Sequence, residues 1–186
     1  MNYFLTSDTH FGHANIIKYC NRPFKDVEEM NSTIIRKFNE RVKEDDICYF
    51  LGDFCFRGNN VHGNGSRAKF ADYRNKLNCK NIIFIRGNHD KNNDVKNLMF
   101  GCMIHYATKS YMCMHNPEHA IAYAYDVNFV GHVHDKWTFR RFVTQFDIKD
   151  CINVGVDAWN FYPVRIEEAL SKYRSWQKGH NTEREA

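Results

Sequence analysis

Short apolar runs in the first half of the chain alternate with segments in which apolar residues recur every three or four positions. The apolar runs are residues 2–7, 47–51 and 82–85, and runs of this kind are typical of buried strands. The segments with helical spacing cover residues 27–43 and 67–77. This order of strands and helices predicts an α/β domain whose first sheet is largely parallel.

Polar residues mark the starts of the two predicted helices. Asp26 stands at the N-cap position of the first helix, and Glu29 occupies the capping-box position three residues later. Ser66 is the predicted cap of the second helix. The residues before it, 54–66, are rich in asparagine and glycine, so they are predicted to form a loop.

The second half of the chain has a different pattern, with several strand-like segments and few helical ones between them. The predicted strands are residues 102–108, 110–114, 127–131, 138–146 and 151–156. Their short connections predict a second sheet or added antiparallel strands. An amphipathic helix is expected from Ile166 to about Gln177, followed by a frayed polar tail over residues 178–186. No repeat or linker divides the chain, so we expect a single domain over residues 1–186.

Composition excludes few classes of protein but narrows the cellular setting. Hydrophobic residues make up 43% and charged residues 26% of the 186 positions, as in ordinary globular domains. The sequence has no run of 18 apolar residues and no basic, cleavable N-terminal segment, so we expect neither a membrane span nor a signal peptide. Seven cysteines without a C-x-x-C pair are typical of reduced thiols, which predicts a cytoplasmic protein. The net charge of +4 suits an anionic substrate but is too small to indicate nucleic-acid binding by itself.

Five short polar motifs each follow a predicted strand. They are Asp8-Thr9-His10, Gly52-Asp53, Gly87-Asn88-His89-Asp90, His115 and Gly131-His132-Val133-His134. Because ligands of α/β sheets bind beyond the carboxyl ends of the strands, we expect the motifs to meet at one edge of the fold.

These motifs contain more oxygen and imidazole ligands than one metal ion needs. The candidate ligands are Asp8, His10, Asp53, Asn88, His115, His132 and His134. Such donors suit Mn²⁺, Fe, Zn²⁺ or Ni²⁺, and two divalent ions about 3.5–4 Å apart are a recurrent device for attacking phosphate esters. Two divalent ions, two carboxylates and a bridging hydroxide would leave a small positive charge, which would attract a phosphate anion.

As an ordered set, the motifs D-x-H, G-D, G-N-H-D/E, H and G-H-x-H resemble the calcineurin-like metallophosphoesterase superfamily, from residue 8 to residue 134. The resemblance implies a four-layer α/β/β/α sandwich of two mixed sheets. It implies a first metal on Asp8, His10, Asp53 and His134 and a second on Asp53, Asn88, His115 and His132, so that Asp53 bridges them. It also implies that His89 binds no metal and faces the leaving group as a general acid.

The second motif matches only part of the longer pattern G-D-x-x-D-R-G found in protein phosphatases. Arg57 and Gly58 match it, so Arg57 is predicted to contact phosphate through its bidentate guanidinium. Phe56 replaces the aspartate that orients the catalytic histidine in those enzymes, so the resemblance does not extend to a protein phosphatase or to how His89 is held.

Two further histidines stand close to the predicted ligands. His115 begins a segment similar to the family's H-x-P pattern, but His119 lies four residues later and is an alternative ligand. His13 lies three residues after His10, where a substrate contact and a helix start are equally supported.

The sequence therefore predicts an enzyme that hydrolyses a phosphate ester through attack of a metal-bridging hydroxide. A phosphodiester is favoured because the chain is small, shows no large cap and leaves a modest positive charge at the site. The alternatives are a nuclease with the same dinuclear site and an inactive binding scaffold on the same fold. The expected partner is a phosphorylated small molecule or nucleotide, with nucleic acid as the alternative and no membrane; the oligomeric state is left open.

Overall fold

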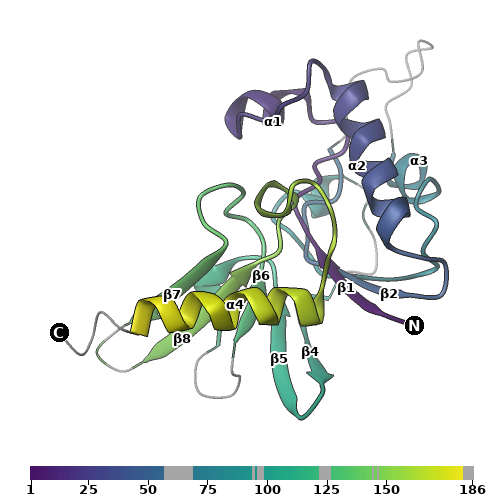
Figure 1. Cartoon of the computed structure of the whole chain (residues 1–186). Helices are drawn as coiled ribbons and strands as arrows, with labels where there is room; N and C mark the ends of the chain where they lie inside the picture. Colours follow the sequence, from purple (N-terminus) through teal and green to yellow (C-terminus); the bar gives the residue numbers. More distant parts are fainter. Residues whose placement is uncertain are drawn as a thin grey trace.

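The computed structural model describes residues 1–56, 69–93, 95, 99–121, 127–143, 145 and 147–181. Two β-sheets form its centre (Figure 1). The first sheet has the order β3-β2-β1-β9, with strands β1 (Tyr3–Thr6), β2 (Ile47–Phe50), β3 (Asn81–Phe84) and β9 (Val164–Arg165). β1, β2 and β3 are parallel, as predicted, and the two-residue β9, which the apolar pattern did not predict, is antiparallel to β1.

The second sheet is mixed and comes from the second half of the chain, as predicted. Its order is β4-β5-β6-β8-β7, with β4 (Gly101–Tyr106), β5 (Lys109–Met114), β6 (Asn128–Val130), β7 (Phe139–Val143) and β8 (Ile148–Asn153). The last predicted strand, 151–156, is shifted: β8 ends at Asn153, and Val156–Trp159 form the 3₁₀ helix η3. The predicted α/β fold of two mixed sheets is confirmed.

The helices flank these sheets. They are α1 (Ala14–Tyr19), α2 (Val27–Arg41), α3 (Phe70–Arg74) and α4 (Ile166–Asn181), with the 3₁₀ helices η1 (Asp90–Asn92) and η2 (Pro117–His119). α2 begins as predicted, because the Asp26 carboxylate accepts a hydrogen bond from the Glu29 amide at 2.8 Å. α1 was not predicted; it is only six residues long, and Ile16 is its one buried residue.

Two predicted helix lengths are wrong. α3 is shorter than residues 67–77 because the chain turns after it, where Arg74 donates to the carbonyls of Leu77 and Lys80 at 3.2 and 3.1 Å. The predicted cap Ser66 lies outside the described residues. α4 continues to Asn181, so the start of the expected tail is helical. The Trp176 ring lies 6.0 Å from Phe139 and 5.8 Å from Tyr173, and this packing stabilises the last turns.

The core explains why the strand ends are held in place. On one face of the first sheet, Phe4 and Phe50 pack with Ile34 and Phe38 of α2. On the other face, the alternate residues pack with the second sheet and with α4; this group includes Leu5, Leu51, Ile85, Phe129, Ile152 and Leu170. Figure 1 shows α4 running across the second sheet. Both faces of the first sheet are therefore buried, and its strand ends form a rigid edge.

Among the described residues, no helix combines the length and the apolar character that crossing a lipid bilayer requires.

Candidate metal centre

The five polar motifs meet at the ends of β1, β2, β3, β5 and β6, as the strand rule predicted. Backbone hydrogen bonds join the loops that carry them. The amide of Asp8 donates to the carbonyl of Gly52 at 3.0 Å, and the amide of Gly131 donates to the carbonyl of His115 at 2.9 Å. The motifs are thus parts of one continuous edge rather than separate surface turns.

Five of the seven candidate ligands have a left-handed backbone, which is costly for residues other than glycine. Asp8, His10, Asp53, His132 and His134 have φ values between 49° and 71°. Each such residue costs on the order of 1–3 kcal/mol unless its surroundings enforce it, and such residues concentrate at functional sites. The conformation turns the side chains out of the strand direction and toward one another.

Asp53 lies at the centre of the cluster. Its Oδ2 atom is 3.4 Å from Nε2 of His115, 3.6 Å from Nε2 of His10 and 3.9 Å from Nε2 of His89. Its Oδ1 atom accepts a hydrogen bond from the backbone amide of His89 at 2.9 Å. Asp53 therefore faces ligands from both halves of the predicted site.

Gly52 allows the close approach of loops around Asp53. It has a φ of +90°, and a Cβ atom there would lie 2.5 Å from the amide nitrogen of Gly87 and 2.7 Å from Nδ1 of His115. Any side chain would push these loops apart, so the G-D motif requires its glycine for space as well as for conformation.

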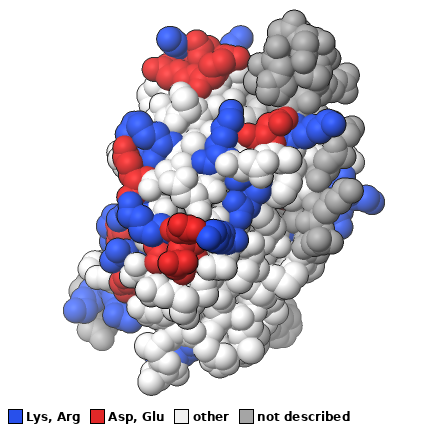
Figure 2. Space-filling model, turned by 90° about the vertical axis from the view of Figure 1, so that its right-hand side faces the viewer, with Lys and Arg blue, Asp and Glu red and all other residues white. Residues whose placement is uncertain are grey.

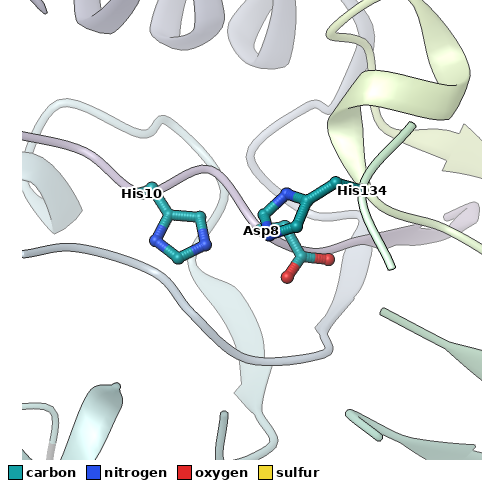
Figure 3. Close-up of side chains that lie close together, drawn as sticks. All are labelled: Asp8, His10 and His134. Carbon is teal, nitrogen blue, oxygen red and sulfur yellow. The ribbon is translucent and has the colours of Figure 1, made fainter. Parts of the chain in front are cut away.

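One half of the cluster brings together Asp8, His10 and His134, whose possible ligand atoms all lie within 4.8 Å of one another. Figure 3 shows the side chains of Asp8 and His10 leaving one loop and that of His134 leaving another. The rings of His10 and His134 stack with centroids 5.2 Å apart. The Asp8 carboxylate accepts hydrogen bonds from Ser7 Oγ and from the His132 amide.

The other half is built on Asn88. Its Oδ1 atom is 2.9 Å from Nε2 of His115 and 3.0 Å from Nδ1 of His132. Nδ1 of His115 donates to the carbonyl of Leu51 at 2.7 Å, which leaves Nε2 as the ligand atom when the ring is neutral. His119, the alternative, instead lies in η2 with its ring 5.2 Å from that of Phe100. The geometry therefore favours His115 over His119.

The residues present fit a pair of divalent cations. Nε2 of His10 is buried and has no hydrogen-bond partner, although buried polar atoms are nearly always paired. Asp8 and Asp53 are both buried and belong, with His115, to a second group of possible ligands. Two buried carboxylates are costly without compensating positive charge. Cations at this position would satisfy the unpaired imidazole and neutralise both acids.

Electrostatics in the cluster link the imidazoles to the carboxylates. Burial by itself would lower the pKa of His115, but its interactions with Asp53 and Asp8 outweigh burial and raise that pKa to about 9. Burial also opposes protonation of His134, yet a hydrogen bond to Asp157 helps to raise its pKa to about 10. Because metal ligands must be deprotonated, a cation that binds His115 and His134 would displace protons.

Asp157 and Arg22 complete the site, and the sequence analysis missed both. Asp157 Oδ2 lies 3.2 Å from Nδ1 of His134, which fixes the ring and leaves Nε2 available as a ligand atom. The buried Arg22 donates to both Asp157 oxygens at 2.8 Å and to the carbonyl of Asp8 at 2.7 Å. Asp157 follows a predicted strand, so the strand rule could have found it. Nothing in the sequence pattern singles out Arg22.

Asp90, the last residue of the third motif, holds the loops rather than a metal. Its buried carboxylate accepts hydrogen bonds from the amides of Asp53, Phe54 and Gly87 at 2.9, 3.0 and 2.7 Å. These bonds tie the second motif to the third and so set the position of Asp53.

His89 and Arg57 were predicted to act near the metal ligands without binding metal, and His13 to contact substrate or to start a helix. The His89 side chain is 45% exposed and lies beside Asp53, with its ring 6.5 Å from that of Phe56. His13 is the N-cap residue of α1, which agrees with the helix-start interpretation, although its side chain makes no capping bond and its ring stacks on Phe56 at 4.5 Å. Arg57, the predicted phosphate contact, lies outside the described residues.

Two cavities flank the ligand cluster. One, of about 250 Å³, is lined by Arg86, Gly87, Asn88, Phe100, His115, Asn116, His119 and His132. The other, of about 290 Å³, is lined by His10, His13, Ile16, Tyr19, Cys20, His89, His134, Asp135 and Lys136. The first therefore opens beside the Asn88 half of the cluster, and the second beside the His10 half.

Comparison with known proteins agrees with this geometry. The family model described as calcineurin-like phosphoesterase matches residues 1–150. The chain belongs to this family. The resemblance predicted from the ordered motifs is thereby confirmed, and family membership together with the candidate ligand groups supports a metal-dependent phosphoesterase.

Two proteins similar to this family member match it over most of its length. The uncharacterized protein MJ1445 of Methanocaldococcus jannaschii is 39% identical over 171 residues, covering 88% of this chain and 86% of its own. The crystal structure of a protein of unknown function, AQ665 from Aquifex aeolicus, has a TM-score of 0.64 at 23% identity and covers 92% and 98% of the two chains. This second similarity shows the shared fold.

Proposed function

We propose that the protein hydrolyses phosphodiesters with the help of two divalent cations. The observation that supports a diester is the pair of cavities on either side of the ligand cluster. A phosphodiester carries two organic groups on one phosphorus, and each cavity offers room for one of them. A monoester would use one cavity and leave the other without a role.

The ligand sets follow the two halves of the cluster. Asp8, His10 and His134 would hold one cation, Asn88, His115 and His132 the other, and Asp53 would contribute to both. When bound, such cations supply Lewis-acid chemistry: they polarise a phosphoryl oxygen and lower the pKa of water. Asp157 and Arg22 keep the His134 ring oriented through the hydrogen bonds between them.

His89 is the proposed general acid for the leaving group. Its ring is partly exposed and lines the cavity beside His10 and His134. Its backbone amide donates to Asp53 at 2.9 Å, whereas Nε2 of its ring lies 3.9 Å from that carboxylate, beyond hydrogen-bond distance. The imidazole therefore remains free to transfer a proton to the alcohol oxygen that departs into this cavity.

The described part of one face gives little support to a nuclease that grips a long strand. On the face shown in Figure 2, basic and acidic residues are interspersed, and no continuous basic band is visible. A strand-binding groove combines a run of positive charge with stacking aromatic side chains. Because the net charge of +4 is also too small to indicate nucleic-acid binding, we favour a small diester over polymeric RNA or DNA.

The test compares bis-(p-nitrophenyl) phosphate with p-nitrophenyl phosphate after the protein has been stripped by a chelator and reloaded with Mn²⁺, Fe²⁺, Zn²⁺ or Ni²⁺. We expect about two bound metal ions per chain and faster hydrolysis of the diester. Preference for the monoester would overturn the diester assignment. Absence of hydrolysis with every metal would favour the inactive scaffold.

A further inference from the structure

The cavity beside Asn88 contains four side chains that the metal centre does not use. Beyond the ligands Asn88, His115 and His132, its lining includes Arg86, Phe100, Asn116 and His119. These residues come from the end of β3, the start of β4 and the segment around η2. They form a wall next to the second half of the cluster, where one substituent of a bound phosphate would lie.

An exposed aromatic pair forms one side of this wall. The Phe100 side chain is 65% exposed, and its ring lies 5.2 Å from that of His119 at an angle of 41°. A large exposed apolar residue beside a cavity is a common feature of binding sites. Flat rings such as nucleobases stack on aromatic side chains of this kind.

Arg86 supplies positive charge to the same wall. Its side chain is exposed, and no described carboxylate forms an ion pair with it. Its backbone amide donates to the carbonyl of Met99 at 2.8 Å, which ties the arginine to the segment that carries Phe100. An unpaired guanidinium can bind a phosphate through two hydrogen bonds.

We propose that this cavity binds a nucleotide as the part of the diester that stays attached to the phosphate. Its base would stack on Phe100 and His119, and a further phosphate of the nucleotide would pair with Arg86. This inference rests on the proposed function, because His89 in the opposite cavity assigns the leaving group to that side. The volume of about 250 Å³ is enough for one nucleoside-sized group rather than a folded macromolecule.

The experiment uses three diesters that share p-nitrophenol as the leaving group and differ in the retained part. They are methyl p-nitrophenyl phosphate, the p-nitrophenyl ester of thymidine 5′-phosphate, and the same ester with an added 3′-phosphate. In each case water adds to phosphorus, the bond to the p-nitrophenyl oxygen breaks, and p-nitrophenol is released. We expect kcat/KM to rise in the order given.

Phe100→Ala should lower kcat/KM for the thymidine ester about tenfold, equivalent to about 1.4 kcal/mol, and leave the methyl ester unchanged. The inhibition constant of thymidine 5′-phosphate should rise by the same factor. Arg86→Gln should remove the preference for the added 3′-phosphate without altering the other two rates. Both side chains are exposed, so the variants are expected to fold.

Tyr19→Ala is the matched control, because Tyr19 is 72% exposed but lines the opposite cavity. It should change all three rates by the same factor. Equal rates for the three diesters, or loss of the thymidine preference in Tyr19→Ala instead of Phe100→Ala, would overturn the subsite. Absence of any hydrolysis, including that of the methyl ester, would instead contradict the proposed function.

Discussion

Two buried clusters of charged groups in this protein differ in how completely their atoms are paired. In the Asp150 cluster on the second sheet, Arg141 donates to both oxygens of Asp150 at 2.7 and 2.6 Å, and Tyr173 and Gln177 donate to Oδ2. In the candidate metal centre, His10 Nε2 has no hydrogen-bond partner, and the Asp53 carboxylate faces three imidazoles at 3.4–3.9 Å.

The backbone shows the same difference. Asp150 lies in a regular stretch of β8 paired with β7, whereas five of the candidate ligands have left-handed conformations. Where the backbone is regular and every polar atom has a partner, the cluster stabilises the fold, and no unpaired atom remains for a ligand to bind. Strained backbone with incomplete pairing costs stability, which a bound cation would restore. The Asp150 cluster is therefore expected to serve stability and the candidate metal centre catalysis, and the substitutions below test this difference.

The largest effect is expected from Asp53→Asn, at the centre of the ligand cluster. The amide removes the negative charge that faces His10 and His115. We expect kcat to fall at least about 10³-fold, more than the loss of a single hydrogen-bond donor causes. Metal analysis should find fewer than two ions per chain. Near-normal turnover with full metal content would show that Asp53 is not shared by two cations.

His89→Asn should lower kcat by roughly 10²–10⁴-fold without loss of metal. The backbone amide of residue 89 still donates to Asp53 in the variant, so the loop position is retained. Because p-nitrophenol needs little protonation, the loss should be larger for an alkyl leaving group. Loss of metal in this variant would place His89 among the ligands rather than at the leaving group.

Asp157→Asn should weaken metal binding about 10–100-fold, since partners that orient a metal-bound histidine have effects of this size. The asparagine can still accept from Arg22, but it no longer offers a charged partner to His134. Metal titration of the stripped protein measures the change, and Arg22→Lys should have a smaller effect in the same direction. Unchanged affinity would remove both residues from the functional cluster.

Asp150→Asn should have the smallest effect on catalysis and act on stability instead. We expect unfolding free energy at pH 7 to fall by about 1.5–3 kcal/mol, the range for hydrogen bonds to a charged group, with kcat and metal content unchanged.

The difference in unfolding free energy between wild type and Asp150→Asn should depend on pH, with a definite sign. Burial opposes ionisation of Asp150, but hydrogen bonds from Arg141 and Tyr173 outweigh it and lower the pKa of the carboxyl. Its stabilisation is therefore fully present above the ordinary pKa of about 4 and is lost as pH falls through the lower folded value. Urea unfolding at pH 7 and pH 3 should show a smaller difference between wild type and variant at the lower pH. A constant difference would mean that charge plays no part in the cluster.

The local pattern of apolar and polar residues was sufficient to predict the strands and helices that bury apolar side chains and the polar motifs at the strand ends. The runs at 47–51 and 82–85 became β2 and β3, and the Asp26 cap started α2. The seven residues predicted as ligands lie in motifs that follow apolar strands, which is why the sequence could place these motifs at one edge of the fold. Strand β9 and helix α1 were not predictable, since two and six residues are too short to carry a period.

What the sequence alone determined was the kind of site: its ligand types, their order and the family to which they belong. Only the tertiary structure decided which side chains share it. Arg22 reaches Asp157 across 135 positions, and Phe100 meets His119 through the packing of the β3–β4 and η2 segments. Such contacts form because the sheets bring together loops that are distant in the sequence. The local spacing of apolar residues carries no information about which loops will meet. The end of β5 likewise places the His115 ring 3.4 Å from Asp53, whereas His119 lies at the cavity wall, and the spacing of the two histidines in the sequence does not contain this difference.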